Sequence, residues 1–332
     1  MTAFGTVFLP EMPLITFDGE QWSPISMVPS DSISLHPGAH VLHYASTCFE
    51  GLKAFKHRDG SVRLFRPECN AARMVQSSTM LHLPPVSSDT LLTMFKQVVK
   101  QYANDIPEPP GSFYLRPTHF GTEAAVGKAV APSASSMLYV LVSPVGDYFD
   151  PNAKPMSVYV DESLMRCAPH MGMIKGGSNY ASCLGLNLKA QQEHGAKMVL
   201  FAPGGDVQET GAANFMLMDD KTLITKDLDS TFLHGITRDS LLTLARDRGM
   251  TVEERSFTVE EMLDFIKRPN AEAALSGTAA VLAPVGSIIH NGETHAVGSG
   301  DFGPITQGLR QTLNDIQWGV APDEHGWLMA VG

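Results

Sequence analysis

A punctuated segment near the middle of the sequence divides the chain into two halves. The run Pro144-Val145-Gly146-Asp147-Tyr148-Phe149-Asp150-Pro151 holds two prolines, a glycine and two aspartates, which interrupt regular secondary structure, and two aromatic residues that can be buried. At 332 residues the chain is long enough for two domains of ordinary size. We therefore predict a small N-terminal domain over residues 1–146, an interdomain loop over 147–155 and a larger domain over 156–332.

Strand and helix patterns are mixed in both halves without strict alternation. Apolar-rich runs at Cys48–Phe55 and Val62–Phe65 flank Asp59-Gly60, a dipeptide typical of hairpin turns. Helical spacing of apolar residues follows Ser87-Ser88-Asp89, and Thr258-Val259-Glu260-Glu261 is a capping box that opens another helix. We expect further strands at Ser112–Arg116, Ser136–Ser143, Met156–Val160, Met198–Phe201, Phe215–Met218 and Leu223–Thr225, and further helices at Ala181–His194 and Asp239–Arg248. Such a mixture favours an α+β fold over a doubly wound sheet.

The charge of the chain argues against several classes of partner. With 35 acidic and 24 basic residues the formal net charge is −11, and the sequence has no basic run. We therefore expect no nucleic acid and no anionic membrane as partner, and no apolar run approaches the ~20 residues that span a bilayer. The first basic residue is Lys53, which argues against a secretory or transit peptide. The four cysteines lack metal-ligand spacing, so we expect no metal, reduced thiols and a cytoplasmic location.

One lysine and one glutamate in the second half stand beside runs of small residues. Lys175 lies in Met-Ile-Lys-Gly-Gly-Ser-Asn-Tyr, and Glu209 lies in Val-Gln-Glu-Thr-Gly-Ala-Ala-Asn-Phe. A lysine beside glycines is by itself most often a solvated turn. An imine with an aldehyde cofactor avoids the cost of about 4 kcal/mol that a neutral lysine otherwise requires at pH 7. Glu209 favours this chemistry, because pyridoxal phosphate needs an acidic group at its ring nitrogen.

Further motifs extend this pattern over nearly the whole chain. They are His43–Phe55, Leu64–Pro67, Tyr114–Pro117, Gly235–Ser240, Ser276–Ala279 and Trp318-Gly319-Val320. Together with the motifs at Lys175 and Glu209, in this order, they resemble the branched-chain amino acid aminotransferases, members of the class-IV family of pyridoxal phosphate enzymes. The resemblance implies a two-domain fold-type IV architecture like that of D-amino acid aminotransferases, with a small N-terminal α/β domain and a larger cofactor-binding domain.

The same resemblance implies a reaction and an assembly. The expected reaction moves the amino group of leucine, isoleucine or valine to 2-oxoglutarate, and gives branched 2-oxo acids and L-glutamate. The expected partners are therefore these small molecules and a second copy of the chain, because members of the family are homodimers. An alternative within the fold is action on D-amino acids, amines or aminodeoxychorismate. A pyridoxal phosphate carrier without turnover is a further alternative, against which the substrate arginine Arg116 argues.

The cofactor ring and its phosphate are expected at different residues. Lys175 is the expected catalytic residue, which binds the cofactor and moves the substrate α-proton, while Glu209 binds the ring nitrogen. The family places a tyrosine at the ring hydroxyl and an arginine at the phosphate, and these match Tyr180 and Arg73. Further phosphate donors are expected at the start of a helix and in a turn, from Ile236, Thr237 and Thr278.

By the same resemblance, the substrate pocket has an apolar wall, a polar edge and a turn that faces the α-carboxylate. The wall is expected from Tyr44, Phe49 and Tyr148, the edge from Tyr114 and Arg116, and the turn from Thr210 and Ala279. The redox Cys-x-x-Cys pair of mammalian members is replaced here by Ala280 and Ala283, so we expect no thiol regulation of that kind. The segment Arg166–Ile174 has fewer glycines than we expect of relatives. We interpret Arg166 as a salt-bridged structural arginine, with support of the site as the alternative.

Overall fold

The computed structural model describes residues 4–147 and 154–332, which form parts of two compact units. Unit 1 comprises Met1–Tyr148, Ile174–Gly177 and Ile316–Gly332, and unit 2 comprises Phe149–Met173 and Ser178–Asp315. Residues 148–153 of the predicted interdomain loop, with the predicted site residue Tyr148, lie outside the described residues. Each unit therefore draws on more than one segment of the chain.

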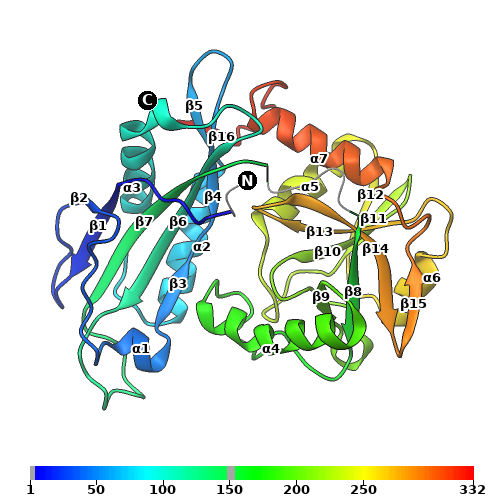
Figure 1. Ribbon diagram of the computed structural model, residues 1–332, viewed down its shortest axis with the longest axis horizontal. Coiled ribbons are helices and arrows are strands. Elements are labelled where there is room, and N and C mark those ends of the chain that lie inside the picture. The colour runs from blue at the N-terminus through cyan, green and yellow to red at the C-terminus, as the bar shows by residue number, and fades with distance from the viewer. Residues whose placement is uncertain (1–3, 148–153) are drawn as a thin grey trace. The chain divides into compact units, whose positions relative to one another are not determined.

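Unit 1 is built on an antiparallel sheet with strand order β16-β5-β4-β6-β7-β1-β2, to which β3 adds by pairing with β6 (Figure 1). The strands are β1 (Glu11–Phe17), β2 (Ser26–Pro29), β3 (Thr47–Phe49), β4 (Leu52–Lys56), β5 (Val62–Phe65), β6 (Ser112–Gly121), β7 (Ser136–Val145) and β16 (Leu328–Ala330). The helices are α1 (His40–Tyr44), α2 (Pro67–Met80) and α3 (Ser88–Gln101), with a 3-10 turn at Ala103–Asp105. The predicted hairpin around Asp59-Gly60 is confirmed as β4 and β5.

One proline changes the predicted strands. The sequence predicts a strand over Ser112–Arg116, but β6 continues through Pro117 to Gly121 in the middle of the sheet. The N–H of Glu50 donates to the Pro117 carbonyl at 2.9 Å, and proline has no N–H to return the bond. The predicted strand Cys48–Phe55 is accordingly divided into β3 and β4, and the gap leaves Glu50 between them.

Helices α2 and α3 pack together, contact the sheet of unit 1 and bury its core (Figure 1). The predicted start of α3 is confirmed, since the Ser87 hydroxyl accepts the N–H of Thr90 at 3.1 Å. On β6 the buried Phe113 and Leu115 belong to this core. Because side chains alternate along a strand, the intervening Tyr114 lies on the opposite face of the sheet.

A histidine in this core is expected to make unit 1 sensitive to acid. His119 is buried between the hydroxyls of Ser78 and Ser136, at 2.9 and 3.0 Å, and burial lowers its pKa to about 3. An unfolded histidine has a pKa near ~6.5, so the unfolded state binds more protons between these values and stability falls as the pH falls through this window. We expect a loss of about 1.5 kcal/mol in the free energy of unfolding between pH 6.5 and pH 5 that His119→Gln removes.

Tryptophan fluorescence in urea measures this effect, because Trp22, Trp318 and Trp327 all belong to unit 1. The wild type and His119→Gln should differ in how the free energy of unfolding changes from pH 6.5 to pH 5, whatever their difference at pH 8. Equal pH slopes for the two proteins would show that His119 does not carry the effect.

Unit 2 contains a mixed sheet with strand order β12-β11-β10-β13-β14-β8-β9, and β15 pairs with β14. Its strands are β8 (Met156–Asp161), β9 (Met198–Phe201), β10 (Asn214–Met218), β11 (Thr222–Thr225), β12 (Thr251–Glu254), β13 (Glu272–Gly277), β14 (Val281–His290) and β15 (Glu293–Ala296). Its helices are α4 (Gly177–His194, of which Gly177 belongs to unit 1), α5 (Ile236–Asp247), α6 (Val259–Phe265) and α7 (Pro304–Gln317, up to Asp315), with a 3-10 turn at Pro203–Gly205. The mixture of antiparallel and parallel pairs is the predicted α+β class.

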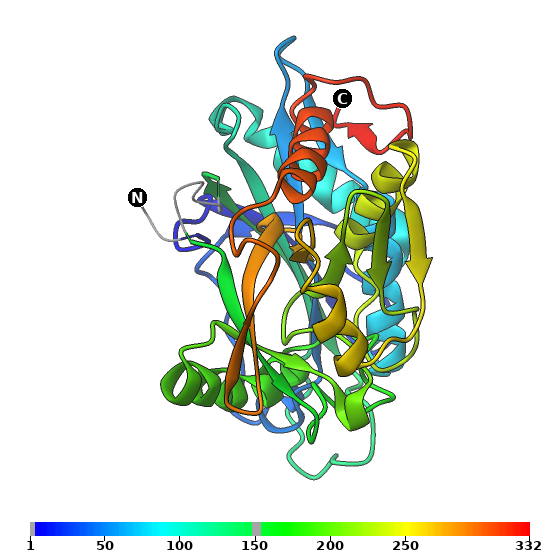
Figure 2. The same cartoon turned by 90° about the vertical axis from the view of Figure 1, so that its right-hand side faces the viewer.

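Two helices of unit 2 cover opposite faces of its sheet (Figures 1 and 2). On β8, Val158 and Val160 pack in the core that contains α6, whereas Tyr159 packs in the cluster that contains α4. This alternation follows from the two-residue period of a strand. The predicted capping box of α6 is confirmed, since Thr258 accepts the N–H of Glu261 at 3.1 Å.

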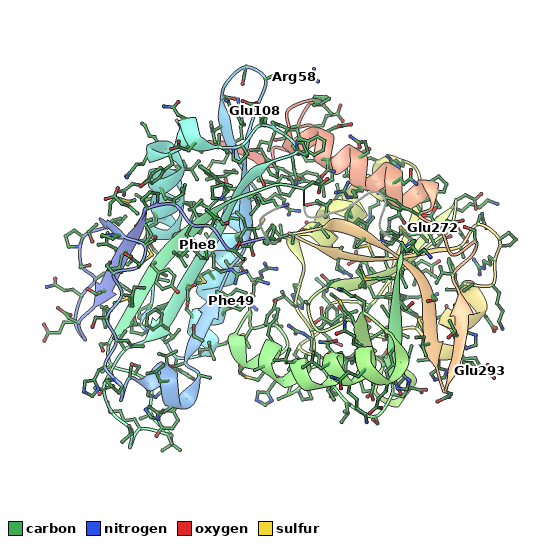
Figure 3. The ribbon with its side chains drawn as sticks, viewed as in Figure 1. Phe8, Phe49, Arg58, Glu108, Glu272 and Glu293 are labelled. Atoms are coloured by element: carbon green, nitrogen blue, oxygen red, sulfur yellow. The ribbon has the colours of Figure 1, made fainter. Side chains whose placement is uncertain are left out.

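A buried carboxylate fixes the start of α7. Glu272 on β13, labelled in Figure 3, accepts the backbone N–H groups of Ile305 and Thr306 at 2.9 and 2.7 Å. A negative charge at this end of a helix is stabilising, because the N–H groups of the first turn lack partners within the helix. Within residues 4–147 and 154–332, no helix has the length and apolar character to cross a membrane.

Candidate active site

The predicted catalytic lysine is held through its backbone. In unit 1 the N–H of Lys175 donates to the Ser77 hydroxyl of α2 at 3.1 Å, and its carbonyl accepts the N–H of Phe49 at 2.9 Å. The next residue, Gly176, forms a bridge with Cys48 on β3. The segment before α4 is thus attached to the end of β3, and the Lys175 side chain takes no part in these three contacts.

A buried ion pair lies beside this segment. Glu50 is fully buried, and its two carboxylate oxygens accept Nε and Nη2 of Arg73 at 2.6 and 2.9 Å. Asn70, one helical turn earlier on α2, donates to the same carboxylate at 2.7 Å. Burial raises the pKa of Glu50, but the charge and hydrogen bonds of Arg73, the charge of Lys175 and the Asn70 bond bring the pKa below its usual value. Glu50 is therefore a carboxylate anion at neutral pH.

One aromatic ring is shared by two cations of unit 1. Phe49, labelled in Figure 3, has the Nζ of Lys175 5.1 Å and the guanidinium carbon of Arg116 4.6 Å from its ring centroid. Arg116 on β6 also donates from Nη2 to the Tyr114 hydroxyl at 2.8 Å, and its buried Nε lacks a hydrogen-bond partner among the described residues. The structure thus brings together four of the predicted site residues, Phe49, Tyr114, Arg116 and Lys175.

Tyr44 does not join this group within unit 1. It lies on α1 against the rings of His40 and His43, and its hydroxyl donates to the carbonyl of Val126. Tyr44 is therefore held by the loop that follows β6 rather than by the residues around Phe49.

In unit 2 the predicted ring partner Glu209 is embedded in hydrogen bonds. It is 3 % exposed, and it accepts the Leu233 N–H at 3.1 Å on Oε1 and the amide of Asn214 at 3.0 Å on Oε2. Arg166, 2 % exposed, places Nη1 3.0 Å from Oε1 of Glu209. The guanidinium carbon of Arg166 also lies 5.7 Å from the ring centroid of Tyr180, in the first turn of α4.

The interpretation of Arg166 as a salt-bridged arginine is confirmed, but the sequence did not indicate that its partner is Glu209. Burial lowers the pKa of Arg166, but the charge of Glu209, with smaller contributions from Tyr180, Cys167 and Cys183, brings the pKa above its usual value. The chain around Arg166 depends on one retained glycine, since a Cβ on Gly172 would lie 2.0 Å from the backbone of Thr231. The sparse glycines of this segment therefore include the one that the packing requires.

The start of α5 lies against Asn214, which donates to Glu209. A Cβ on Gly235, the N-cap residue of α5, would lie 2.0 Å from Oδ1 of Asn214, so only glycine allows this approach. Ile236 and Thr237 are the first two residues of α5. Helix α5 begins at Ile236, three residues before the predicted start at Asp239. Gly235, packed against Asn214, is the N-cap residue directly before it.

The remaining predicted residues of unit 2 lie in two turns. The Thr210 hydroxyl and N–H bond the backbone of Ala213, which closes a tight turn after Glu209. Thr278 and Ala279 lie in the turn between β13 and β14. This turn follows Ser276, which pairs with Asn214 across the sheet, so the turn neighbours the start of β10.

Comparisons with known proteins decide the family. Residues 47–288 match the family model described as amino-transferase class IV. The chain is 39 % identical to a probable branched-chain-amino-acid aminotransferase of Streptomyces coelicolor over 98 % of this chain and 91 % of that protein. It is 35 % identical to branched-chain-amino-acid aminotransferase 2 of Bacillus subtilis over 99 % and 92 % of the two chains. The chain belongs to the class IV branched-chain-amino-acid aminotransferases.

Solved structures agree with this membership. A crystal structure of the T.th. branched-chain amino acid aminotransferase with pyridoxamine 5′-phosphate superposes with a TM-score of 0.80 at 25 % identity, over 97 % of this chain and 99 % of the other. The Escherichia coli branched-chain amino acid aminotransferase gives a TM-score of 0.77 at 28 % identity, over 92 % and 97 %. The predicted family, the fold-type IV architecture and pyridoxal phosphate as cofactor of this class IV aminotransferase are thereby confirmed.

The residues of this aminotransferase fit the cofactor. Gly235 is the N-cap residue of α5, and the backbone N–H groups at the start of a helix can bind phosphate. The buried hydroxyl of Ser276, beside Thr278 in sequence, lacks a hydrogen-bond partner among the described residues. Glu209 supplies a buried carboxylate, and Lys175 supplies an amine on an anchored backbone.

Three side chains of these two groups were not among the predicted site residues. Glu50 contacts Arg73, and Ser77 contacts the backbone of Lys175. Arg166 contacts Glu209. The only sequence signal for Ser77 is its spacing on α2, since residues 70, 73 and 77 recur on one helical face. Glu50 and Arg166 find their partners across the fold, and their spacing in sequence carries no such signal.

Proposed function

We propose that this aminotransferase moves the amino group of L-leucine, L-isoleucine or L-valine to 2-oxoglutarate at Lys175. The observation that carries the proposal is the arrangement around Phe49, where the lysine amine and the Arg116 guanidinium flank one apolar ring. A branched aliphatic side chain requires an apolar surface, and the side-chain carboxylate of glutamate requires a cation. The Phe49 ring and Arg116 supply both next to one nucleophile.

The residues divide the work of binding and proton transfer. When bound, pyridoxal phosphate supplies an electron sink for the charge left by the departing α-proton. Lys175 would hold the cofactor at its aldehyde carbon, and its amine, once released and neutral, would take the substrate α-proton and return it as an acid. Glu209 holds the proton at the ring nitrogen, and Tyr180 binds the ring hydroxyl. Arg73, Ile236, Thr237 and Thr278 bind the phosphate.

The substrate contacts follow the same division. Phe49 forms the proposed apolar wall, to which the family resemblance adds Tyr148 and Tyr44, although Tyr44 lies outside the group around Phe49 in unit 1. Tyr114 and Arg116 form the proposed polar edge, and the turns at Thr210 and Ala279 the proposed site of the α-carboxylate. We also propose a small domain over 1–146, a loop over 147–155, a cofactor domain over 156–332, and a cytoplasmic homodimer. The four free cysteines support the location, and sedimentation at several concentrations tests the dimer.

A glycine beside Arg116 tests the polar edge. A Cβ on Gly51 would lie 2.1 Å from the Tyr114 hydroxyl, so Gly51→Ala must displace the group that accepts Nη2 of Arg116. Loss of a hydrogen bond to a charged group corresponds to about a tenfold change or more, and we expect kcat/KM for glutamate to fall by that factor. For leucine we expect a smaller fall, since its side chain has no carboxylate for Arg116 to bind.

The control for this variant adds the same methyl group where there is room. A Cβ on Gly185 of α4 meets no atom within 4 Å, so Gly185→Ala should leave both kcat/KM values unchanged. Equal losses for glutamate and leucine in Gly51→Ala would contradict the assignment of Arg116 to the glutamate carboxylate.

Product analysis tests the proposed reaction as a whole. Purified protein with cofactor and 2-oxoglutarate should form L-glutamate when L-leucine, L-isoleucine or L-valine is the donor. It should form no D-glutamate from D-alanine and release no pyruvate from aminodeoxychorismate. Either of these two products, without L-glutamate formation from the branched-chain donors, would assign the chain to the alternative activity within the same fold.

A further inference from the structure

Within the described residues, the Glu50 carboxylate accepts four hydrogen bonds from three residues, two of them from Arg73. Glu50 is fully buried and binds Arg73 through two hydrogen bonds of 2.6 and 2.9 Å, and its Oε2, which accepts Nη2 of Arg73, also accepts the Asn70 amide at 2.7 Å. The N–H of Gly51 is a further donor, 3.2 Å from Oε2. The hydrogen bonds from Asn70 and Gly51 thus fix the orientation of the Glu50 carboxylate independently of Arg73.

This geometry fixes the plane of the guanidinium. An arginine has five N–H donors in a rigid planar fork, and Glu50 takes the Nε–Nη2 edge. A phosphate bound by Arg73 must accept hydrogen bonds from the remaining N–H groups of the guanidinium. These groups lie in the guanidinium plane, whose orientation Glu50 fixes. The charges of the pair also cancel, so directed hydrogen bonds rather than net charge must supply the affinity of Arg73 for phosphate.

We propose that Glu50 is a positioning residue for cofactor phosphate, which acts by clamping the guanidinium of Arg73. The proposal rests on the proposed role of Arg73 at the phosphate. It differs in sign from a purely electrostatic effect: removal of a negative charge near a phosphate strengthens binding, whereas loss of a clamp weakens it. Measured affinities therefore distinguish the two.

The test compares two ligands that differ only in the phosphate. The full-length apoprotein is titrated with pyridoxal 5′-phosphate and with pyridoxal, followed by absorbance, for the wild type and Glu50→Gln. Glutamine presents an NH₂ group to one of the two Arg73 donors, so one bond of the clamp is lost. We expect the affinity for pyridoxal 5′-phosphate to fall about tenfold, the effect of one hydrogen bond to a charged group, and that for pyridoxal to stay within about twofold.

Two further variants show whether the effect passes through Arg73. Arg73→Met should weaken pyridoxal 5′-phosphate about a hundredfold, and Glu50→Gln should then have no additional effect in the Arg73→Met background. Asn70→Ala keeps the ion pair but removes one hydrogen bond to Glu50. Its affinity for pyridoxal 5′-phosphate should therefore lie between the affinities of the wild type and of Glu50→Gln. This variant also carries the test if Glu50→Gln does not fold.

Each outcome has a defined meaning. Selective loss for pyridoxal 5′-phosphate that disappears in the Arg73→Met background supports the proposal. Equal losses for both ligands make Glu50 a support of the fold only, tighter binding makes its charge unfavourable to the phosphate, and unchanged binding means that it does not act on the phosphate; each of these results overturns the proposal. If Arg73→Met itself binds pyridoxal 5′-phosphate normally, the proposed phosphate role of Arg73 is wrong, and this result is distinct from a failure of Glu50 alone.

Discussion

Replacement of Lys175 by alanine is expected to abolish transamination, with a fall in turnover of at least ~10⁴-fold, because one amine serves as nucleophile and as acid and base. The variant should fold, since the contacts that anchor this segment use the backbone. The Lys175 N–H reaches Ser77, its carbonyl receives the Phe49 N–H, and Gly176 bridges Cys48. Turnover of L-leucine with 2-oxoglutarate measures the loss, and circular dichroism checks the fold.

Two variants control this prediction. Lys175→Arg keeps a cation but cannot form a neutral amine at ordinary pH, so it should be as inactive as alanine. Lys189→Ala, on the exposed surface of α4, should retain full activity. An added small amine should restore part of the turnover of Lys175→Ala by replacing the missing base. Residual turnover of more than about a hundredth of the wild type, without such an amine, would contradict the assignment.

Replacement of Glu209 by glutamine is expected to lower turnover by about 10²-fold or more, since the ring nitrogen loses an anionic partner and a hydrogen bond to a charged group. The same change leaves Arg166, 2 % exposed, without its carboxylate, so the free energy of unfolding should also fall, by about 3–5 kcal/mol. Steady-state kinetics at saturating cofactor and thermal unfolding of the apoprotein separate the two effects.

A second buried glutamate provides the matched control. Glu272 accepts the N–H groups of Ile305 and Thr306, so Glu272→Gln should also lower stability. Its folded fraction should keep the wild-type kcat, because Glu272 binds the start of α7 and has no proposed role in the reaction. If Glu209→Gln behaves like Glu272→Gln, with a loss of stability but no loss of kcat, then Glu209 is a structural residue.

Features that depend on local chemistry were predictable from the sequence. The hairpin of β4 and β5 depends on Asp59-Gly60, and the start of α6 depends on the Thr258 cap. Both form through neighbours within a few residues. Lys175 and Glu209 could likewise be proposed as site residues, because a motif of small residues beside a reactive group is itself local.

Features that depend on partners far along the chain were not predictable. The division between β3 and β4 arises because Pro117, on a different strand, cannot return a hydrogen bond to Glu50. Glu50 in turn meets Arg73 on α2, and Arg166 meets Glu209 across unit 2. Such pairings follow from the register of strands and the docking of helices. A spacing pattern in one segment contains neither.

The absorbance spectrum of the purified protein tests the central claim most directly. After addition of pyridoxal 5′-phosphate, a visible band from cofactor bound to Lys175 should appear, and L-leucine should convert it to the near-ultraviolet band of the aminated cofactor while D-alanine leaves it unchanged. This outcome would establish the cofactor, the first half of the reaction and the stereochemical class together. Absence of the band after cofactor is supplied, or its discharge by D-alanine but not by L-leucine, would contradict the account.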